Sequence, residues 1–309
     1  MESYKLSHPC LQKYVSGGEY LGEQQYLDLI GNILMNGSMK LGRNGNTISK
    51  FGNTMRFSLQ NGEIPILTTK KVAWKTCLKE LLWFISGNTN NEVLRTENVH
   101  IWDGNSTREF LDSRGLTENK EGDLGPVYGF QWRHFNAEYK GCDENYDSCG
   151  IDQLANVISL LKNKETRNSR RIIMSAWNPC QLDQMALPPC HVICQFNITD
   201  DDKLSCLLFQ RSGDVGLGVP FNIASYSLLT HIIAKHCGLV PFEFVYVLGD
   251  AHIYDNHINA MVEQVGREPY AFPTLNITNI HENIEDYTIT DFELLEYKHH
   301  APIKMDMSA

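Results

Sequence analysis

The chain has 309 residues, of which 42% are hydrophobic and 21% charged, and its formal net charge is −10 at pH 7. The apolar fraction is sufficient for a large core. The negative charge argues against general binding to nucleic acid or to an anionic membrane, so an anionic ligand would need a local basic pocket. No apolar run reaches the length of a membrane span, and no signal-peptide pattern opens the sequence. We therefore expect no membrane partner and no dedicated nucleic-acid partner.

Cysteine usage indicates the compartment. The nine cysteines are scattered and odd in number, which indicates a reducing compartment, the cytoplasm, and leaves nuclear or mitochondrial pools open. The spacings Cys142/Cys149 and Cys190/Cys194 do not fit a zinc site, and we predict no metal. The length would allow two domains, but no linker-like break divides the sequence, so one α/β domain over residues 1–309 is predicted.

The first sixty residues offer few functional signals. Residues 1–19 are polar, and we expect them to be poorly ordered. Residues 26–35 have the pattern of a short amphipathic helix, and a turn at Arg43 precedes a strand over residues 48–59. From position alone, Arg43 could be a solvated turn residue.

A helix is predicted over residues 74–84, where apolar side chains recur with helical spacing. Glu80 lies among them, next to Leu81 and Leu82. A carboxyl group in such a setting can have a raised pKa and transfer protons. The alternative is a surface glutamate paired with Lys75 or Lys79.

Aromatic residues follow in two short segments. After a predicted helix over residues 89–97, Trp102 could form a stacking wall for a flat ligand or pack in the core. Tyr128 follows a glycine–proline turn and could equally be a core tyrosine with a satisfied hydroxyl. Residues 136–150 are polar and acidic and predict a surface insertion before a helix over residues 151–162.

Arg170 and Arg171 precede a predicted strand over residues 172–177. Adjacent residues in a strand point to opposite faces, so one phosphate would rarely bind both. From position alone, a solvated basic edge is favoured over a phosphate site.

Residues 187–226 carry most of the candidate chemistry. Two prolines fix the backbone ahead of Cys190, and the β-branched and aromatic residues from 191 to 198 predict a strand directly after it. A thiol at this position can face a cleft, and Arg211 could favour its thiolate form. The alternative is a buried structural cysteine.

The same stretch supplies polar groups after a second apolar run, residues 204–210, at the end of which a strand is expected to end. Arg211 beside Ser212 suits a phosphate, although an ordinary ion pair is the alternative. The glycines within residues 213–218 predict a flexible loop. Asn222 then precedes an apolar helix over residues 223–236, where it is either the N-cap or a reader of a base edge, because an amide carries both a donor and an acceptor.

Near the C-terminus, a strand is predicted over residues 243–248 and a helix over residues 255–266. The histidines and the aspartate within residues 252–257 fit no standard pattern of metal ligands. Residues 302–309 predict a frayed tail.

Three long motifs in one order closely resemble the thymidylate synthase family: Met185-Ala-Leu-Pro-Pro-Cys-His191, Gln210-Arg-Ser-Gly-Asp214 and Gly216-Leu-Gly-Val-Pro-Phe-Asn-Ile-Ala-Ser-Tyr226. The resemblance extends from about Tyr20 to the C-terminus. It implies a single α/β (α+β) domain with a large mixed, mostly antiparallel twisted sheet covered by helices. One face of that sheet would lie at a homodimer interface.

The resemblance implies reductive methylation of dUMP to dTMP, with 5,10-methylenetetrahydrofolate as the cosubstrate and dihydrofolate as the second product. Two alternatives stay open. One is a pyrimidine hydroxymethylase of the same fold, in which water captures the methylene group. The other is a non-catalytic nucleotide-binding homologue.

The resemblance also assigns roles to residues of this sequence. The implied catalytic residues are Cys190 as the nucleophile, with Glu80, Tyr128, Asp214 and Asn222. The implied dUMP site consists of Arg43, Gln210, Arg211, Ser212, Asp214, Asn222, His252 and Tyr254, with Arg170 and Arg171 reaching across from the partner subunit.

The implied folate site consists of Ile101, Trp102, Asn105, Asp214, Leu217, Gly218, Phe221, Met307 and Ala309. Residues 302–309 would form a mobile lid over it. The loop at Arg43 is shorter than the pattern familiar in the family, which is a departure at the phosphate site.

Overall fold

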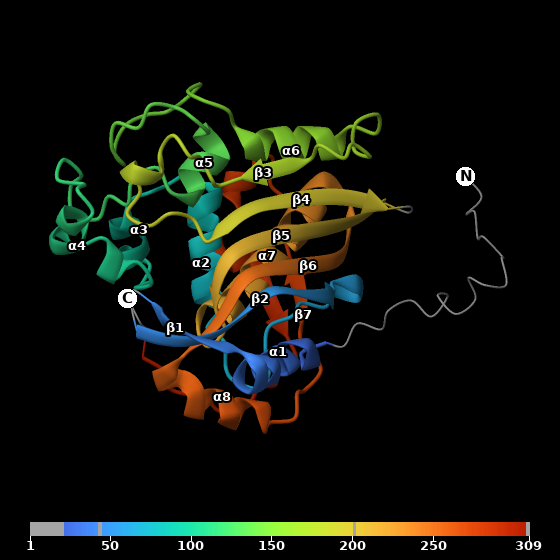
Figure 1. The fold of residues 1–309 in the computed structure, drawn as a ribbon. Helices are drawn as coiled ribbons and strands as arrows, with labels where there is room; N and C mark the ends of the chain where they lie inside the picture. Colours follow the sequence, from blue (N-terminus) through green and yellow to red (C-terminus); the bar gives the residue numbers. More distant parts are fainter. Residues whose placement is uncertain (1–21, 43–44, 200–201, 307–309) are drawn as a thin grey trace.

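The computed structural model describes residues 22–42, 45–199 and 202–306. Its main sheet has the strand order β1-β2-β6-β5-β4-β3, and β7 and β8 form a separate pair (Figure 1). The strands are β1 (Ser38–Gly42), β2 (Gly45–Ser58), β3 (Ile173–Ser175), β4 (His191–Thr199), β5 (Lys203–Asp214), β6 (Val240–Tyr254), β7 (Thr274–Ile277) and β8 (Phe292–Leu295). Neighbouring strands of the main sheet are antiparallel except β5 and β6, which run parallel. The predicted mixed, mostly antiparallel sheet in one α/β domain is confirmed.

The helices pack on the sheet and around its edges. They are α1 (Gln24–Asn36), α2 (Trp74–Ile85), α3 (Asn91–Thr96), α4 (Arg108–Ser113), α5 (Tyr128–His134), α6 (Gln153–Lys162), α7 (Gly218–Cys237) and α8 (Ile258–Val265). Helix α7 lies against β5, β6 and α2 (Figure 1). It is apolar around most of its circumference, which is typical of a helix buried on nearly every side.

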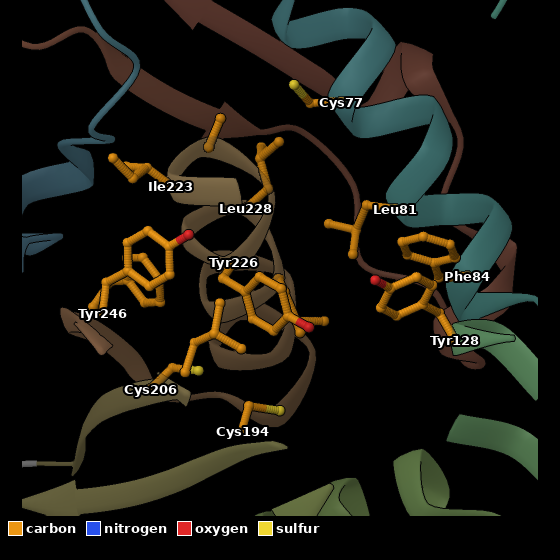
Figure 2. Packing of buried hydrophobic residues seen from close by; sticks show 14 of the residues in the cluster. Cys77, Leu81, Phe84, Tyr128, Cys194, Cys206, Ile223, Tyr226, Leu228 and Tyr246 are labelled. Atoms are coloured by element: carbon orange, nitrogen blue, oxygen red, sulfur yellow. The ribbon is translucent and has the colours of Figure 1, made fainter. Parts of the chain in front are cut away.

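The core lies between the sheet and helices α2 and α7. In β5, Cys206 and Leu208 are completely buried, whereas Leu207 between them is 37% exposed. This alternation follows from the two-residue period of a strand. Figure 2 shows residues of α7, α2 and the strands gathered in this core: Tyr226, Leu228, Leu81, Phe84, Cys194, Cys206 and Tyr246.

Most predicted elements end within a few residues of their expected bounds, among them α1, α2, α6 and β4. The predictions were wrong where strands continue past their apolar runs. β5 extends beyond Gln210 to Asp214, and β6 extends beyond Leu248 to Tyr254. The two strands stay paired as far as Asp214, which lies opposite His252, so backbone pairing continues where the side chains become polar.

The predicted glycine loop over residues 213–218 is also wrong. Gly213 belongs to β5 and Gly218 opens α7. A Cβ atom at Gly213 would lie 2.8 Å from the Leu248 side chain, so this glycine permits close packing of the sheet. The connection between β5 and α7 is therefore short.

Residues 137–150 contain no helix or strand, and most of their side chains are exposed. Two tyrosines of this segment nevertheless pack against the rest of the domain. The rings of Tyr139 and Tyr146 meet that of Phe130 edge-on, at centroid distances of 5.0 and 4.8 Å. The Tyr139 hydroxyl also donates to the Asp123 carboxylate at 2.6 Å.

Candidate active site

The candidate site forms where β5 and β6 end and β4 begins. Because β5 and β6 are parallel, their C-terminal ends reach the same edge of the sheet. β4 runs antiparallel to β5 and starts there, with His191 opposite Gln210. This topology brings together residues that are more than fifty positions apart in the sequence, such as Cys190 and His252.

Cys190 is held by its backbone from two sides. Its N–H donates to the Tyr128 hydroxyl at 2.8 Å, and its carbonyl accepts from the Arg211 N–H at 3.0 Å. The strand starts directly after Cys190, as predicted. The position of the thiol is thus fixed by the sheet and by α5.

Two cavities meet at Cys190. One, of about 630 Å³, carries most of the polar side chains, and the other, of about 410 Å³, carries most of the aromatic ones. Both are lined by Leu187, Cys190, Ser212 and Asp214. The polar cavity is completed by Lys40, Leu41, Thr47, Arg114, Pro188, Arg211, Asp250, His252 and Tyr254. The aromatic cavity is completed by Glu80, Phe84, Ile101, Trp102, Asn105, Tyr128, His191, Gln210, Leu217, Gly218, Phe221 and Asn222.

Burial raises the pKa of the Cys190 thiol, and the positive charge of Arg211 opposes this shift. We expected Arg211 to favour the thiolate, and its charge acts in that direction, but the effect of burial is larger. The thiol is therefore protonated at neutral pH in the unliganded protein. A ligand or a proton acceptor must assist its ionisation.

The Arg211 guanidinium is fixed by the two prolines ahead of Cys190. Its Nε donates to the Pro189 carbonyl and its Nη2 to the Pro188 carbonyl, both at 2.8 Å. Its Cζ lies 5.7 Å from the centre of the Trp177 ring. The side chain keeps its remaining donors for the polar cavity, where Ser212 adds a hydroxyl.

Glu80 accepts a hydrogen bond of 2.7 Å from the Trp102 indole N–H at the wall of the aromatic cavity. Lys79, its sequence neighbour, pairs with Glu97 instead. Protein atoms surround the carboxyl group closely, and this burial raises the pKa of Glu80 to about 7, against the bond from Trp102. The carboxyl group can therefore exchange a proton near neutral pH.

The raised pKa of Glu80 predicts that the free energy of unfolding falls as the pH rises. Because the folded pKa is about 7 and the ordinary value is 4.5, the wild type loses stability relative to Glu80→Gln as the pH rises from about 4.5 to 7. Above pH 7 this change in the free energy of unfolding of the wild type, relative to Glu80→Gln, amounts to about 3 kcal/mol. Thermal unfolding of both proteins from pH 4.5 to 8 measures it. Glu97→Gln, on the surface, is the control, and a pH-independent difference for Glu80→Gln would contradict the burial argument.

Asn222 lies inside α7, which begins at Gly218, so the N-cap interpretation is wrong. The Asn222 Oδ1 accepts from the Gln210 Nε2 at 3.0 Å. The Gln210 Oε1 in turn accepts from the Tyr246 hydroxyl at 2.6 Å. This chain of bonds fixes the Asn222 amide at the wall of the aromatic cavity.

His191 was not among the predicted site residues. It is buried beside Tyr128, with ring centroids 5.0 Å apart. Burial lowers the pKa of His191 to about 4, against a hydrogen bond with Asn222. The imidazole is therefore neutral at physiological pH. Its place next to Cys190 in the motif was the one available signal.

Two cations, Lys40 and Arg114, also line the polar cavity and were not predicted. Lys40 pairs with Asp250 at 2.6 Å. Arg114 follows α4 and is exposed. Neither lies in a sequence pattern whose spacing distinguishes a cavity residue from a solvated one.

Some of the predicted site residues do not line either cavity of this chain or lie outside the described residues. Arg170 and Arg171 are exposed and line neither cavity. They precede β3, which begins at Ile173, as predicted, so the argument that adjacent strand residues point to opposite faces does not apply to them. Arg43, Met307 and Ala309 lie outside the described residues.

The described residues contain no group of three or more histidine, cysteine, aspartate or glutamate side chains that could hold a metal ion. His252 instead contacts Asp250, with 3.2 Å between Nδ1 and Oδ1. In the same part of the chain, no helix is long and apolar enough to cross a membrane.

Comparisons with known proteins identify the family. The family model for thymidylate synthase matches residues 24–309. The bifunctional dihydrofolate reductase-thymidylate synthase of Leishmania major is 55% identical over 288 residues, which is 93% of this chain and 55% of that protein. The protein of the same description from Plasmodium berghei (strain Anka) is 53% identical over 298 residues, 96% of this chain and 49% of that protein. The one from Paramecium tetraurelia is 54% identical over 305 residues, 98% and 64% respectively. The chain thus spans about half of the first two relatives and rather more of the third.

Proposed function

The chain belongs to the thymidylate synthase family, and we propose that it is a methyltransferase that converts dUMP and 5,10-methylenetetrahydrofolate to dTMP and dihydrofolate. The observation that carries this proposal is the position of Cys190 at the junction of two cavities with different linings. A nucleophile between two binding sites can bond to one ligand while that ligand meets the other.

The polar cavity suits a nucleoside monophosphate. Arg211 and Ser212 would bind the phosphate, and His252 and Tyr254 would bind the deoxyribose 3′-hydroxyl group. The pyrimidine ring would then reach Cys190. Asn222, held in place by Gln210, would read the edge of the base.

The aromatic cavity suits a folate. Its walls include Trp102 and Phe221, which can flank a flat heteroaromatic ring, and the carboxylate of Asp214 can accept from ring N–H groups. Ile101, Asn105, Leu217 and Gly218 complete the walls in this proposal. When bound, the folate supplies the one-carbon unit and the hydride.

The residues of the chain perform the remaining steps. The sulfur of Cys190 bonds to carbon 6 of uracil, which turns carbon 5 into a nucleophilic enolate carbon. Carbon 5 later loses its proton, and the sulfur–carbon bond breaks to release the product. Glu80, with its pKa of about 7, and Tyr128 would organise these proton transfers through water.

A spectrophotometric assay with dUMP and 5,10-methylenetetrahydrofolate tests the proposal. A synthase forms dihydrofolate in equal amount to dTMP. A pyrimidine hydroxymethylase would release a hydroxymethyl nucleotide without dihydrofolate, and a non-catalytic homologue would give no turnover. Either outcome would contradict the proposed reaction.

We further propose that the enzyme is a homodimer. The strand register places Leu207, Phe209, Val245 and Val247 on the sheet face opposite Cys206 and Leu208, with Leu207 opposite Val245 and Phe209 opposite Val247. Leu207 is 37% exposed, and Phe209 and Val247 are partly exposed. A second copy packed on this face would bury them. Arg170 and Arg171 would then reach the phosphate in the partner's polar cavity.

If each active site contains residues of both subunits, two inactive variants should restore activity when they form mixed dimers. A Cys190→Ala protein is mixed with an Arg170→Ala/Arg171→Ala protein. After random exchange half of the dimers are mixed, and each has one site with all native groups, so activity should recover to roughly a quarter of wild type. Exchange is verified with a tagged subunit. No recovery despite exchange would mean that each site is built from one chain.

The cytoplasm is the proposed compartment, because the described cysteines are all unpaired. In the same proposal the tail, residues 302–309, acts as a lid that closes over the folate. Its described part, up to Asp306, has no regular secondary structure.

A further inference from the structure

His257 connects the C-terminal tail to the candidate active site. It ends a short 3-10 turn, Asp255–His257, directly before α8, and its side chain is 1% exposed. Its Nε2 lies 2.7 Å from the backbone carbonyl oxygen of Asp306, in the tail. Its Nδ1 lies 4.0 Å from the Oδ1 of Asp214, which lines both cavities.

The partner of Nε2 determines the tautomer of the ring. A carbonyl oxygen only accepts hydrogen bonds, so the Nε2 of His257 carries the proton and donates to Asp306. Nδ1 has no hydrogen-bond partner among the described residues. The ring therefore holds the tail with one nitrogen and faces Asp214 with the other.

Gly216 lies next to both Asp214 and His257. Its N–H donates to the Asp214 Oδ1 at 2.8 Å, and its carbonyl accepts from the Lys70 ammonium group. A Cβ atom at this glycine would lie 3.0 Å from the Nδ1 of His257 and 3.2 Å from the Sδ of Met305. The tail, the imidazole and the loop are therefore closely packed against one another.

We propose that His257 is a positioning residue that couples docking of the tail to the geometry of Asp214. The inference rests on the proposed function in one respect, namely that Asp214 binds the folate. The His257 ring holds the tail at Asp306 and supports the loop through which Asp214 is oriented. Loss of the ring should therefore release the tail and weaken folate binding, while the nucleotide site keeps its own contacts at Arg211.

Two substitutions at His257 separate the contribution of its hydrogen bond to Asp306 from that of the ring itself. His257→Leu removes the donor, whereas His257→Gln keeps an amide N–H that can reach the Asp306 carbonyl. His300→Leu is the matched control, because the His300 Nε2 also lies 2.8 Å from a backbone carbonyl, that of Glu268, while its ring stacks on Tyr270 at 4.8 Å. Melting temperatures establish that each variant folds.

Release of the C-terminal residues by carboxypeptidase, in the free protein, measures tail docking. We expect His257→Leu to speed release about tenfold, His257→Gln less, and His300→Leu not at all. Calorimetric titration in a Cys190→Ala background, where no covalent complex forms, measures affinity for 5,10-methylenetetrahydrofolate in the presence of dUMP, and for dUMP alone. His257→Leu should weaken folate binding about tenfold and leave dUMP affinity within about twofold.

Three outcomes would overturn the inference. Unchanged tail release in His257→Leu would mean that the ring does not hold the tail. Faster release with unchanged folate affinity would mean that docking and Asp214 are not coupled. Equal losses of dUMP and folate affinity would mean a merely structural role, and if His257→Leu folds poorly, His257→Ala, which also lacks the donor, is judged by the same criteria. Failure of the proposed reaction is distinguishable, because the tail-release measurement needs neither ligand nor turnover.

Discussion

Cys190→Ala is expected to lower kcat for dTMP formation by roughly 10³-fold or more, because it removes the atom that bonds to carbon 6 of uracil. Affinity for dUMP should change by less than about threefold, since the contacts of Arg211 and Asn222 remain and one small side chain is lost. Turnover and calorimetric binding of dUMP measure the two effects separately.

The other cysteines provide the controls. Cys180 is exposed and lines neither cavity, so Cys180→Ala should have wild-type activity. If Cys190→Ala kept a substantial part of kcat, the nucleophile would be another group. If it lost dUMP affinity in proportion to kcat, the thiol would act in binding.

Asn222→Asp is expected to invert, or nearly invert, the preference for dUMP over dCMP. Uracil presents a ring N–H donor beside a carbonyl acceptor, and the Asn222 amide can pair with both. Cytosine presents a bare ring nitrogen beside an amino donor, which a protonated carboxyl group can match. A buried unpaired group costs about 1–3 kcal/mol, and the substitution both removes one match and adds another. The ratio of the two kcat/KM values should therefore shift by about 10²-fold or more.

The structure simplifies the interpretation of this substitution, because the sequence had left open that Asn222 is a helix N-cap. Because Asn222 lies inside α7, its replacement alters no helix cap. The Gln210 Nε2, which donates to the Asn222 Oδ1, can donate to a carboxyl oxygen in the same place. An unchanged preference, with a melting temperature near that of wild type, would mean that Asn222 does not read the base.

The sequence was sufficient for features that depend on local patterns. The helical spacing around Glu80 predicted its apolar setting, and the prolines before Cys190 predicted where β4 begins. Apolar periodicity failed at the start of α7, because Gly218 and Pro220 read as loop residues although proline is tolerated in the first turn of a helix. It also failed at the end of β5, where parallel pairing with β6 extends the strand through polar residues.

Other features depend on tertiary proximity and have no local signal. The link from His257 to Asp306 joins residues that are 49 positions apart. Burial raises the pKa of the Cys190 thiol in spite of Arg211, and a sequence does not report how far a side chain is buried. The roles of Arg170 and Arg171 concern a second chain, which no pattern within one chain can place.

The most direct measurement of the central claim is mass spectrometry of the protein after incubation with 5-fluoro-dUMP and 5,10-methylenetetrahydrofolate. The fluorine at carbon 5 cannot leave as a proton does, so the reaction should stop with protein, nucleotide and folate covalently joined. We predict that digestion locates the adduct on Cys190. An adduct on Cys180 or Cys194, or an unmodified protein, would contradict the assignment of Cys190 as the nucleophile.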